Sequence, residues 1–451
     1  MLGGPSMSKE VVARDGGGVD KLPPLRSNGR FRLLWGGSAL SVMAERSSTM
    51  AFTLLVLWHT GSKSAAGLVG FAALLPMLVM QLPAGVLVDR WDRRRVMLVC
   101  VAGRALAIGS VAVSLAGDEV RVWHIAAVAF VQGSLTVFYQ LSERAAVRGV
   151  VPPQQVSTAM AQNEARSRAV NFVGHPASGV MFGLSAWVPF LSSTGLYLMS
   201  LLTLTRLRIP AQRSGRGKSA RGLREEISSG LRWVWQRAYF RSALLVIAGS
   251  NLVFQGLILT VAVLVREQGR PASTVGLIMA AGSIGGLLGA FSGGWLSRRL
   301  PMRRVMIYAH VAWAVIMPGT VFLLHPVILG ILFFITSHIG AAVTVSGMSH
   351  QVRITPDAMQ GRVGSVVMLL VSGASSIGAL GTGYLLEGFG TRGTLAIASG
   401  VMALLAVVAT VVFTRPGAEL EDRSAQEEAS GHQRELTAGP PTTMTLRRID
   451  G

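Results

Sequence analysis

The sequence predicts an all-α membrane protein with about twelve transmembrane helices in two pseudo-symmetric six-helix halves. Three observations predict this fold class: an apolar composition, a series of long apolar runs and an internal repeat. Half of the 451 residues are hydrophobic, only 14% are charged, and the mean hydropathy is +0.49. Because a soluble domain carries roughly 25% charged residues, we interpret the apolar excess as surface that a bilayer covers.

The apolar runs are long enough to cross a bilayer, which takes about 20 residues of helix. The first six lie at 32–58, 65–88, 96–116, 122–141, 157–182 and 184–206. The second six lie at 240–264, 273–297, 304–324, 326–349, 360–386 and 393–414. The run at 157–182 is the least apolar, and its assignment depends partly on its place in the series.

An internal repeat relates the two sets of runs. The segment Gly85–Met97 aligns with Gly294–Met306 at an offset of 209 residues, with seven of thirteen positions identical. Each copy lies between the second and third run of its set. Duplicated halves are typical of secondary transporters, whose substrate site lies between the halves near the middle of the membrane.

The repeat and the polar segments divide the chain into five expected parts. Residues 31–207 and 240–414 are the two six-helix halves, and 208–239 is a basic central loop with an amphipathic helix. The polar ends, 1–30 and 415–451, are expected to be disordered tails.

Arginines in the short loops predict the orientation. They concentrate on one side of the predicted bundle, in the loops around 90–95, 144–148, 298–304 and 353–362, and in the central segment. Because cytoplasmic loops are rich in Lys and Arg, we expect both termini in the cytoplasm and the protein in the cytoplasmic (inner) membrane.

The net charge of +20 would also suit a nucleic-acid-binding protein. The charges lie in clusters between apolar runs, however, instead of forming a stripe on a soluble module. We therefore expect a lipid bilayer and no nucleic acid as partner, and a monomer.

The sequence carries no sign of an enzyme. Cys100 is the only cysteine, so an intrachain disulfide and a thiolate metal site are excluded. No metal-ligand spacing, nucleophile triad or phosphate-binding loop is found in the sequence. We expect no cofactor and no metal, and an ion gradient in place of ATP as the energy source.

The segment Gly85–Arg95 resembles the loop motif Gly-x-x-x-Asp-Arg-x-x-Arg-Arg of the major facilitator superfamily, which follows the second transmembrane helix. The wider chain, over about residues 31–414, is similar to the branch that contains enterobactin exporters and macrolide-efflux proteins. The supporting pieces are Phe31–Trp35, Leu75-Pro76, Val151–Pro153, Pro189-Phe190, Thr355–Asp357 and Gly361–Val363. This resemblance implies the two-half fold and secondary transport.

Two positions depart from the drug-antiporter pattern. Ala129 stands where such antiporters often carry an Arg, three residues before Gln132-Gly133. The fifth-helix motif centres on Gly-Pro-x-x-Gly-Gly in the family, whereas this chain reads His175-Pro-Ala-Ser-Gly-Val180. The residues that match this antiporter-like motif are Gly174, Pro176 and Gly179.

The loop motif is expected to act as a conformational latch formed by Gly85, Asp89, Arg90, Arg94 and Arg95. A carboxylate at a helix end can pair with Arg and with the N-terminus of a neighbouring helix. The alternative is that the arginines only hold the loop in the cytoplasm. In the second copy Arg298 replaces the acidic residue, so we expect a weaker latch or none there.

Glu45 is the leading candidate for proton coupling because a charge inside a membrane span is costly and usually functional. It shares one helix face with hydroxyl residues at spacings of three and four, namely Ser38, Ser41, Ser48 and Thr49. Removal of a carboxylic acid from water favours its protonated form. The alternative is a static charge pair of Glu45 with Arg46 or Arg104.

Other polar residues are candidates with a structural alternative. His175 and Arg104 could serve coupling or cargo binding, or could simply be packed and hydrogen-bonded. Glu164 and Arg168 are expected to pair along one helix, and Glu143 is expected at the membrane interface.

These observations predict a secondary active efflux transporter for an amphipathic small molecule (a drug, an antibiotic or a siderophore), working by proton antiport and alternating access. An importer of a polar metabolite is the alternative in the same class. A non-transporting membrane sensor or interaction protein is the alternative in another class.

Overall fold

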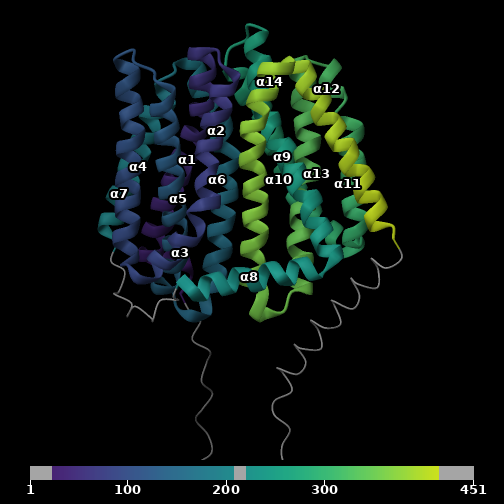
Figure 1. Ribbon diagram of the computed structural model, residues 1–451. Coiled ribbons are helices and arrows are strands. Elements are labelled where there is room, and N and C mark those ends of the chain that lie inside the picture. Colours follow the sequence, from purple (N-terminus) through teal and green to yellow (C-terminus); the bar gives the residue numbers. More distant parts are fainter. Residues whose placement is uncertain (1–22, 208–219, 416–451) are drawn as a thin grey trace, which may run out of the picture.

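A computed structural model describes residues 23–207 and 220–415. In these ranges the chain is a bundle of long, roughly parallel helices joined by short turns (Figure 1). The two tails that we expect to be disordered lie outside the described ranges, except for short stretches next to the bundle.

The N-terminal half is formed by α1–α7. Its helices are α1 (Gly29–Thr60), α2 (Lys63–Val79), α3 (Gln81–Arg90), α4 (Arg93–Ala116), α5 (Val122–Val150), α6 (Val156–Leu184) and α7 (Val188–Arg206). The span expected at 65–88 is therefore made of two helices, α2 and α3. Pro76 lies inside α2 and has no backbone N–H to donate, which weakens the helix before this break.

The C-terminal half follows a surface helix, α8 (Ala220–Gln236), which lies in the expected central loop. Its helices are α9 (Ala238–Glu267), α10 (Ser273–Arg299), α11 (Met302–Ile316), α12 (Gly319–Phe322), α13 (Pro326–Ile354) and α14 (Gln360–Phe413). The 54-residue α14 contains Gly390 at φ 65°. This left-handed conformation, which glycine adopts without steric cost, separates two rods that correspond to the last two expected spans.

Among the described residues, nine helices are long and apolar enough to cross a membrane, and the shorter α2 is apolar as well. The pair α2–α3, the more polar α6 and the two rods of α14 lie where the remaining spans of the predicted twelve are expected. The all-α, two-set architecture predicted from the sequence is therefore confirmed.

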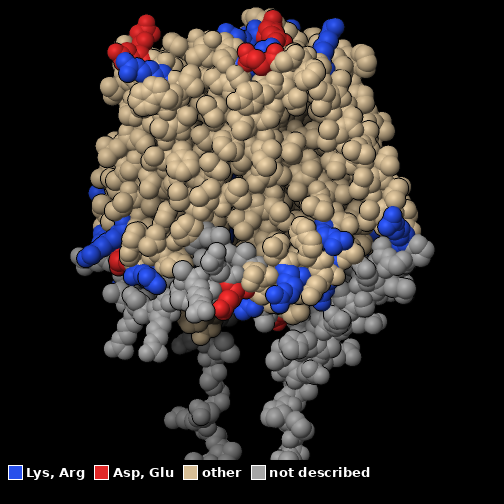
Figure 2. Space-filling view, viewed as in Figure 1, with Lys and Arg blue, Asp and Glu red and all other residues tan. Residues whose placement is uncertain are grey.

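The surface of the bundle carries an apolar belt. In Figure 2, Lys, Arg, Asp and Glu side chains gather at the two ends, and other residues cover the broad band between them. Leu106, Val113 and Phe291 on the surface are 75%, 73% and 75% exposed. Backbone polar groups inside such a belt are satisfied within the helices, as a bilayer requires, so this is a multi-pass membrane protein.

Candidate functional site

The two halves meet along two helix pairs, α2 with α14 and α6 with α10. Glycines allow the close approach in both pairs. A Cβ atom built on Gly67 of α2 would lie 2.8 Å from the Cα atom of Gly383 in α14. In the other pair, a Cβ atom on Gly276 of α10 would lie 3.0 Å from the Cα atom of Gly179 in α6.

These two crossings are related by the internal repeat. The offset of 209 residues takes Gly67 to Gly276. Helices α6 and α14 begin at 156 and 360, and the same difference takes Gly179 to Gly383. The fifth-helix motif thus supplies one glycine of a symmetric pair of contacts between the halves. Its Gly174 lies against α1, where an added Cβ would be 2.6 Å from the Cβ of Arg46.

Polar contacts join the halves at one end of the bundle. Lys63 at the start of α2 donates to the Glu267 carboxylate at the end of α9, at 2.6 Å. Glu267 also accepts a 2.6 Å hydrogen bond from Thr391. The backbone N–H of Ser64 donates to Glu387 of α14 at 3.0 Å. We call these residues the outer cluster, after the orientation that the loop arginines predict.

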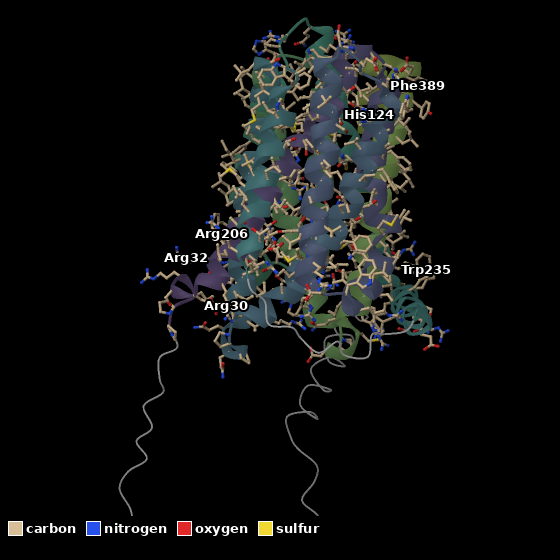
Figure 3. All side chains as sticks on the ribbon, turned by 90° about the vertical axis from the view of Figure 1, so that its left-hand side faces the viewer. Arg30, Arg32, His124, Arg206, Trp235 and Phe389 are labelled. Atoms are coloured by element: carbon tan, nitrogen blue, oxygen red, sulfur yellow. The ribbon has the colours of Figure 1, made fainter. Side chains whose placement is uncertain are left out.

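The outer cluster lies at the end opposite α8. Phe389, between Glu387 and Thr391 in sequence, lies at that end together with His124, whereas Trp235 of α8 lies at the other end (Figure 3). Arg30, Arg32 and Arg206 share the α8 end with Trp235 (Figure 3). The Lys63–Glu267 ion pair and the hydrogen bond from Ser64 to Glu387 join the two halves, so the halves are tied at that end.

Glu45 lies in the middle of α1, where it is half-buried. None of the ion pairs within the described residues includes it, so the static pair with Arg46 or Arg104 is not formed here. The backbone carbonyl of Glu45 accepts hydrogen bonds from Ser48 at 3.1 Å and Thr49 at 2.8 Å. These bonds hold the two hydroxyls against the backbone of α1.

Arg104 is fully buried in α4 and is held by hydroxyls and aromatic rings. Its Nη2 donates to Ser41 Oγ at 2.8 Å and its Nη1 to Thr136 Oγ1 at 3.5 Å. The guanidinium also lies 4.5 Å from the ring centroid of Tyr139 and 4.9 Å from that of Tyr197. Cation–π contacts of this kind strengthen when they are removed from water. None of the ion pairs among the described residues includes Arg104, so these hydroxyls and rings hold the cation.

The buried ion pair of the N-terminal half joins Arg166 of α6 to Glu143 of α5, at 2.7 Å. Both side chains are less than 10% exposed, at 4% and 8%. Glu143 is therefore buried inside the bundle, and α5 continues past it to Val150, beyond the predicted end of the span. Its place at the membrane interface stays a prediction. Glu164 and Arg168 pair at 2.8 Å, as predicted.

His175 is half-buried in α6, next to Gly174. Because Gly174 packs against the side chain of Arg46, His175 and Arg46 belong to the same crossing of α6 with α1. Glu45, Arg46, Arg104 and His175 are thus all found in the N-terminal half, on α1, α4 and α6.

The loop motif joins α3 to α4. Arg93 donates to the carbonyl of Ala145 at 3.0 Å, and Arg94 donates to the carbonyl of Thr205 at 2.6 Å. Asp92 caps α4 by accepting from the backbone N–H of Arg95 at 2.8 Å. Arg90 is exposed, and a Cβ atom on Gly85 would meet nothing within 4 Å. The side chain of Asp89 lies outside the described residues, so the latch stays a prediction.

A pocket of about 330 Å³ lies between α9, α11 and α13, and we call it the C-half pocket. Its aromatic lining residues are Phe254, Trp313 and Phe333, and its polar ones include Ser250, Asn251, His310, Thr336, Ser337 and Thr344. The sequence did not single out this pocket. The internal repeat could have indicated it, because the 209-residue offset takes Arg104 to Trp313, a residue that lines the pocket.

His310 lines the C-half pocket and is held in place by contacts at both ring nitrogens. Its Nδ1 lies 2.7 Å from the carbonyl of Met306, and its Nε2 lies 2.9 Å from Ser250 Oγ. Because a carbonyl only accepts, Nδ1 carries a proton. The Ser250 hydroxyl has one proton and lies within hydrogen-bond distance of two acceptors, His310 Nε2 and the carbonyl of Val246 at 2.9 Å. Small molecules bind in pockets of this kind, which combine aromatic walls with a few fixed polar groups.

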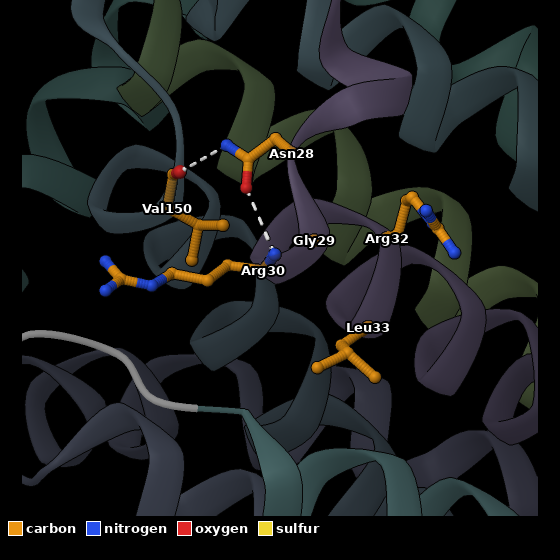
Figure 4. Close-up of a pocket in the computed structure, with 6 residues that line it drawn as sticks. All are labelled: Asn28, Gly29, Arg30, Arg32, Leu33 and Val150. Carbon is orange, nitrogen blue, oxygen red and sulfur yellow. Dashed lines mark hydrogen bonds between the residues drawn. The ribbon is translucent and has the colours of Figure 1, made fainter.

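A second, larger depression of about 750 Å³ lies at the start of α1 (Figure 4). Asn28 caps α1 there by accepting from the N–H of Arg30 at 3.1 Å, and it donates to the carbonyl of Val150 at 2.9 Å. These bonds tie α1 to the end of α5 within one half, so the depression is a junction at the α8 end and not a path between the halves.

Comparisons with known proteins agree with this geometry. The family model described as Major Facilitator Superfamily matches residues 34–337 and 245–448. The chain is 29% identical over 395 residues to the multidrug efflux pump Tap of Mycolicibacterium fortuitum, covering 82% of this chain and 93% of the relative.

Two further similarities are more limited. Macrolide efflux protein A of Streptococcus pyogenes is 26% identical over 163 residues, covering 35% of this chain and 38% of that protein. The crystal structure of the nucleoside transporter NupG superposes with a TM-score of 0.70 at 14% identity, covering 86% of this chain and 99% of that one. At that identity the likeness to the solved structure concerns the fold alone.

Proposed function

Since this chain belongs to the major facilitator superfamily, we propose that it is a secondary active efflux transporter for an amphipathic small molecule. Its similarity over most of its length to a multidrug efflux pump supports export, and the two-half architecture supports alternating access between the halves. We propose that the transporter works as a monomer in the cytoplasmic membrane, with protons as the counter-transported ion and no nucleic acid as partner.

Alternating access would use the two crossings as the moving contacts. In the described conformation the halves are tied at the end that carries the outer cluster. The α8 end carries Arg30, Arg32 and Arg206 (Figure 3), and the positive-inside rule assigns such an end to the cytoplasm. We therefore propose that this conformation is closed toward the outside, with both termini in the cytoplasm.

Glu45 is the proposed coupling residue. The observation that carries this proposal is a carboxylate in the middle of a span with no ion-pair partner among the described residues. A carboxylate that is held by no cation can take up a proton without breaking an ion pair. Proton binding would favour one conformation and cargo binding the other, which couples the two flows.

The variant Glu45→Gln tests this role in proteoliposomes. It keeps the shape of the side chain but removes the titrating group, so we expect export that no longer responds to an imposed pH gradient, while downhill exchange of cargo continues. Thr49→Ser is a matched control on the same face. If Glu45→Gln concentrates cargo like the wild type, then coupling depends on another group, and His175 is the next candidate.

A further inference from the structure

The C-half pocket occupies the place that Arg104 fills in the N-terminal half. Helices α1 and α9 begin at 29 and 238, and α4 and α11 begin at 93 and 302, so both pairs share the 209-residue offset. Helices α5 and α13 run over 122–150 and 326–354, an offset of 204 residues.

These offsets give the equivalent side chains. Ser250 stands at the position of Ser41, and Trp313 stands at the position of Arg104. Gly340 stands at the position of Thr136, the residue that closes the Arg104 site from α5.

Space is left in the C-terminal half because Gly340 stands where the N-terminal half has Thr136. In the N-terminal half the guanidinium reaches from α1 to α5 and fills the gap. In the C-terminal half a Cβ atom built on Gly340 would meet a single neighbour within 4 Å, the Trp313 ring at 3.7 Å. The fold therefore keeps the same three-helix site in both halves, filled by the protein's own side chain in one and left open in the other.

The walls of the open site favour an aromatic ring. The Trp313 ring lies edge-on to Phe254 at a centroid distance of 4.8 Å and to His310 at 5.0 Å. Phe333 contributes a third ring from α13. Aromatic groups attract one another in such edge-to-face and offset arrangements, so a planar ring entering the pocket finds partners on three helices.

The same walls disfavour a charged group. No residue that lines the pocket is Asp, Glu, Lys or Arg, and His310 uses both ring nitrogens in hydrogen bonds. A charge placed there would lose its hydration without a counter-ion, which is costly. The volume of about 330 Å³ is about twice that of an apolar cavity that holds benzene, so the pocket has room for one or two rings.

We propose that the C-half pocket binds an uncharged aromatic ring of the exported molecule. This assignment rests on the proposed efflux function and names the site and the chemical class of cargo that it selects. Ser250, Asn251 and Thr344 offer hydroxyl and amide groups at the same pocket to a polar substituent of that ring.

A cysteine reporter tests binding directly. Cys100, the only cysteine, is replaced by Ala, and Ala341→Cys places a thiol in the pocket lining. Gly347→Cys, on the same helix but outside the lining, is the matched control. Alkylation by N-ethylmaleimide is then timed in lipid nanodiscs with N-phenyl-1-naphthylamine, an uncharged two-ring probe, or with the permanently cationic ethidium.

We expect the uncharged probe to slow alkylation at position 341 by about tenfold when it is present at about ten times its Kd, and to leave position 347 unchanged. Ethidium should protect position 341 much less. Equal protection by ethidium would overturn the selection for an uncharged ring, and no protection by either probe would overturn the site.

Export of the same probe from proteoliposomes separates this proposal from the proposed function. Gly340→Val should fill the pocket and slow export, whereas Gly347→Val should not. If the wild type exports the probe while position 341 stays unprotected and Gly340→Val exports normally, the pocket assignment fails and the efflux function stands. If the probe protects position 341 but neither the wild type nor any variant exports it against a gradient, the proposed efflux function fails and the binding site stands.

Discussion

The crossing of α2 with α14 predicts that a single methyl group at Gly383 will open the outer end. In Gly383→Ala the new Cβ would lie 2.9 Å from the carbonyl oxygen of Lys63 and 3.0 Å from the Cα atom of Gly67. Both contacts are with backbone, which cannot rotate away. Because carbon atoms prefer separations of about 3.5–4.0 Å, the two helices must move apart by about 0.5–1 Å.

Overpacking of this kind costs about 1–3 kcal/mol. The cost applies only to the conformation in which the outer end is closed, since the two helices separate when it opens. A difference of about 1–3 kcal/mol changes the ratio of two conformations about 5- to 150-fold. We therefore expect Gly383→Ala to shift the protein toward the outward-open conformation.

The measurement is the distance between spin labels at Thr60 and Arg270, which are exposed at the outer ends of the two halves. The labels are attached in a Cys100→Ala background. Without a substitution at Gly383, most molecules should show the short distance between the labels, and few should show the long distance of the outward-open conformation. Gly381→Ala is the matched control, because it makes the same exchange in the same helix with nothing within 4 Å of the new Cβ. Identical distance distributions for Gly383→Ala and Gly381→Ala would refute the reasoning.

Three further predictions follow from the charged residues. Lys63→Gln should destabilise the conformation with a closed outer end by at most about 1 kcal/mol, because the pair with Glu267 is partly exposed. The same distance measurement should show an effect that shrinks at high salt. An effect that does not depend on salt would contradict the ion-pair account. Arg166→Gln should lower stability by about 3–5 kcal/mol, because it leaves Glu143 buried without a partner, and thermal unfolding should show recovery when Glu143→Gln is added; no recovery would mean that the pair is not the cause. Asp89→Asn should slow transport while membrane abundance stays near normal, and wild-type rates in flux assays would reduce the loop motif to a topology signal.

The fold was predictable because hydropathy and repetition are properties of the sequence itself. Each expected span corresponds to one helix, to a pair of helices or, for the last two, to one of the two rods of α14, and the less apolar α6 is included. The details that escaped prediction are local. Proline and the neighbouring turn divide the second span into α2 and α3, and α5 extends to Val150 beyond its apolar run, which carries Glu143 into the interior.

The candidate site was only partly predictable because its contacts join helices that are distant in sequence. The charges of α1 and α4 were visible as polar residues in apolar runs. The pairing of Arg104 with Ser41 and with two tyrosine rings was not, because it depends on how α1, α4, α5 and α7 pack. The C-half pocket was hidden for the same reason, since it is defined by a missing side chain at Gly340.

The unequal distribution of charge between the halves bears on how protons and cargo are coupled. The predicted spans of the N-terminal half contain Glu45, Arg46, Arg104 and the charges of α6, whereas those of the C-terminal half contain no Asp, Glu, Lys or Arg beyond their first few residues. A proton and an uncharged ring would then bind in different halves of the same molecule. Because each half is a packed body, a change at either site acts on the other through the contacts between the halves, chiefly the two glycine crossings and the outer cluster. Coupling would therefore depend on the strength of those contacts, so variants at Gly383 or Lys63 should change the stoichiometry of protons to cargo while leaving both binding sites intact.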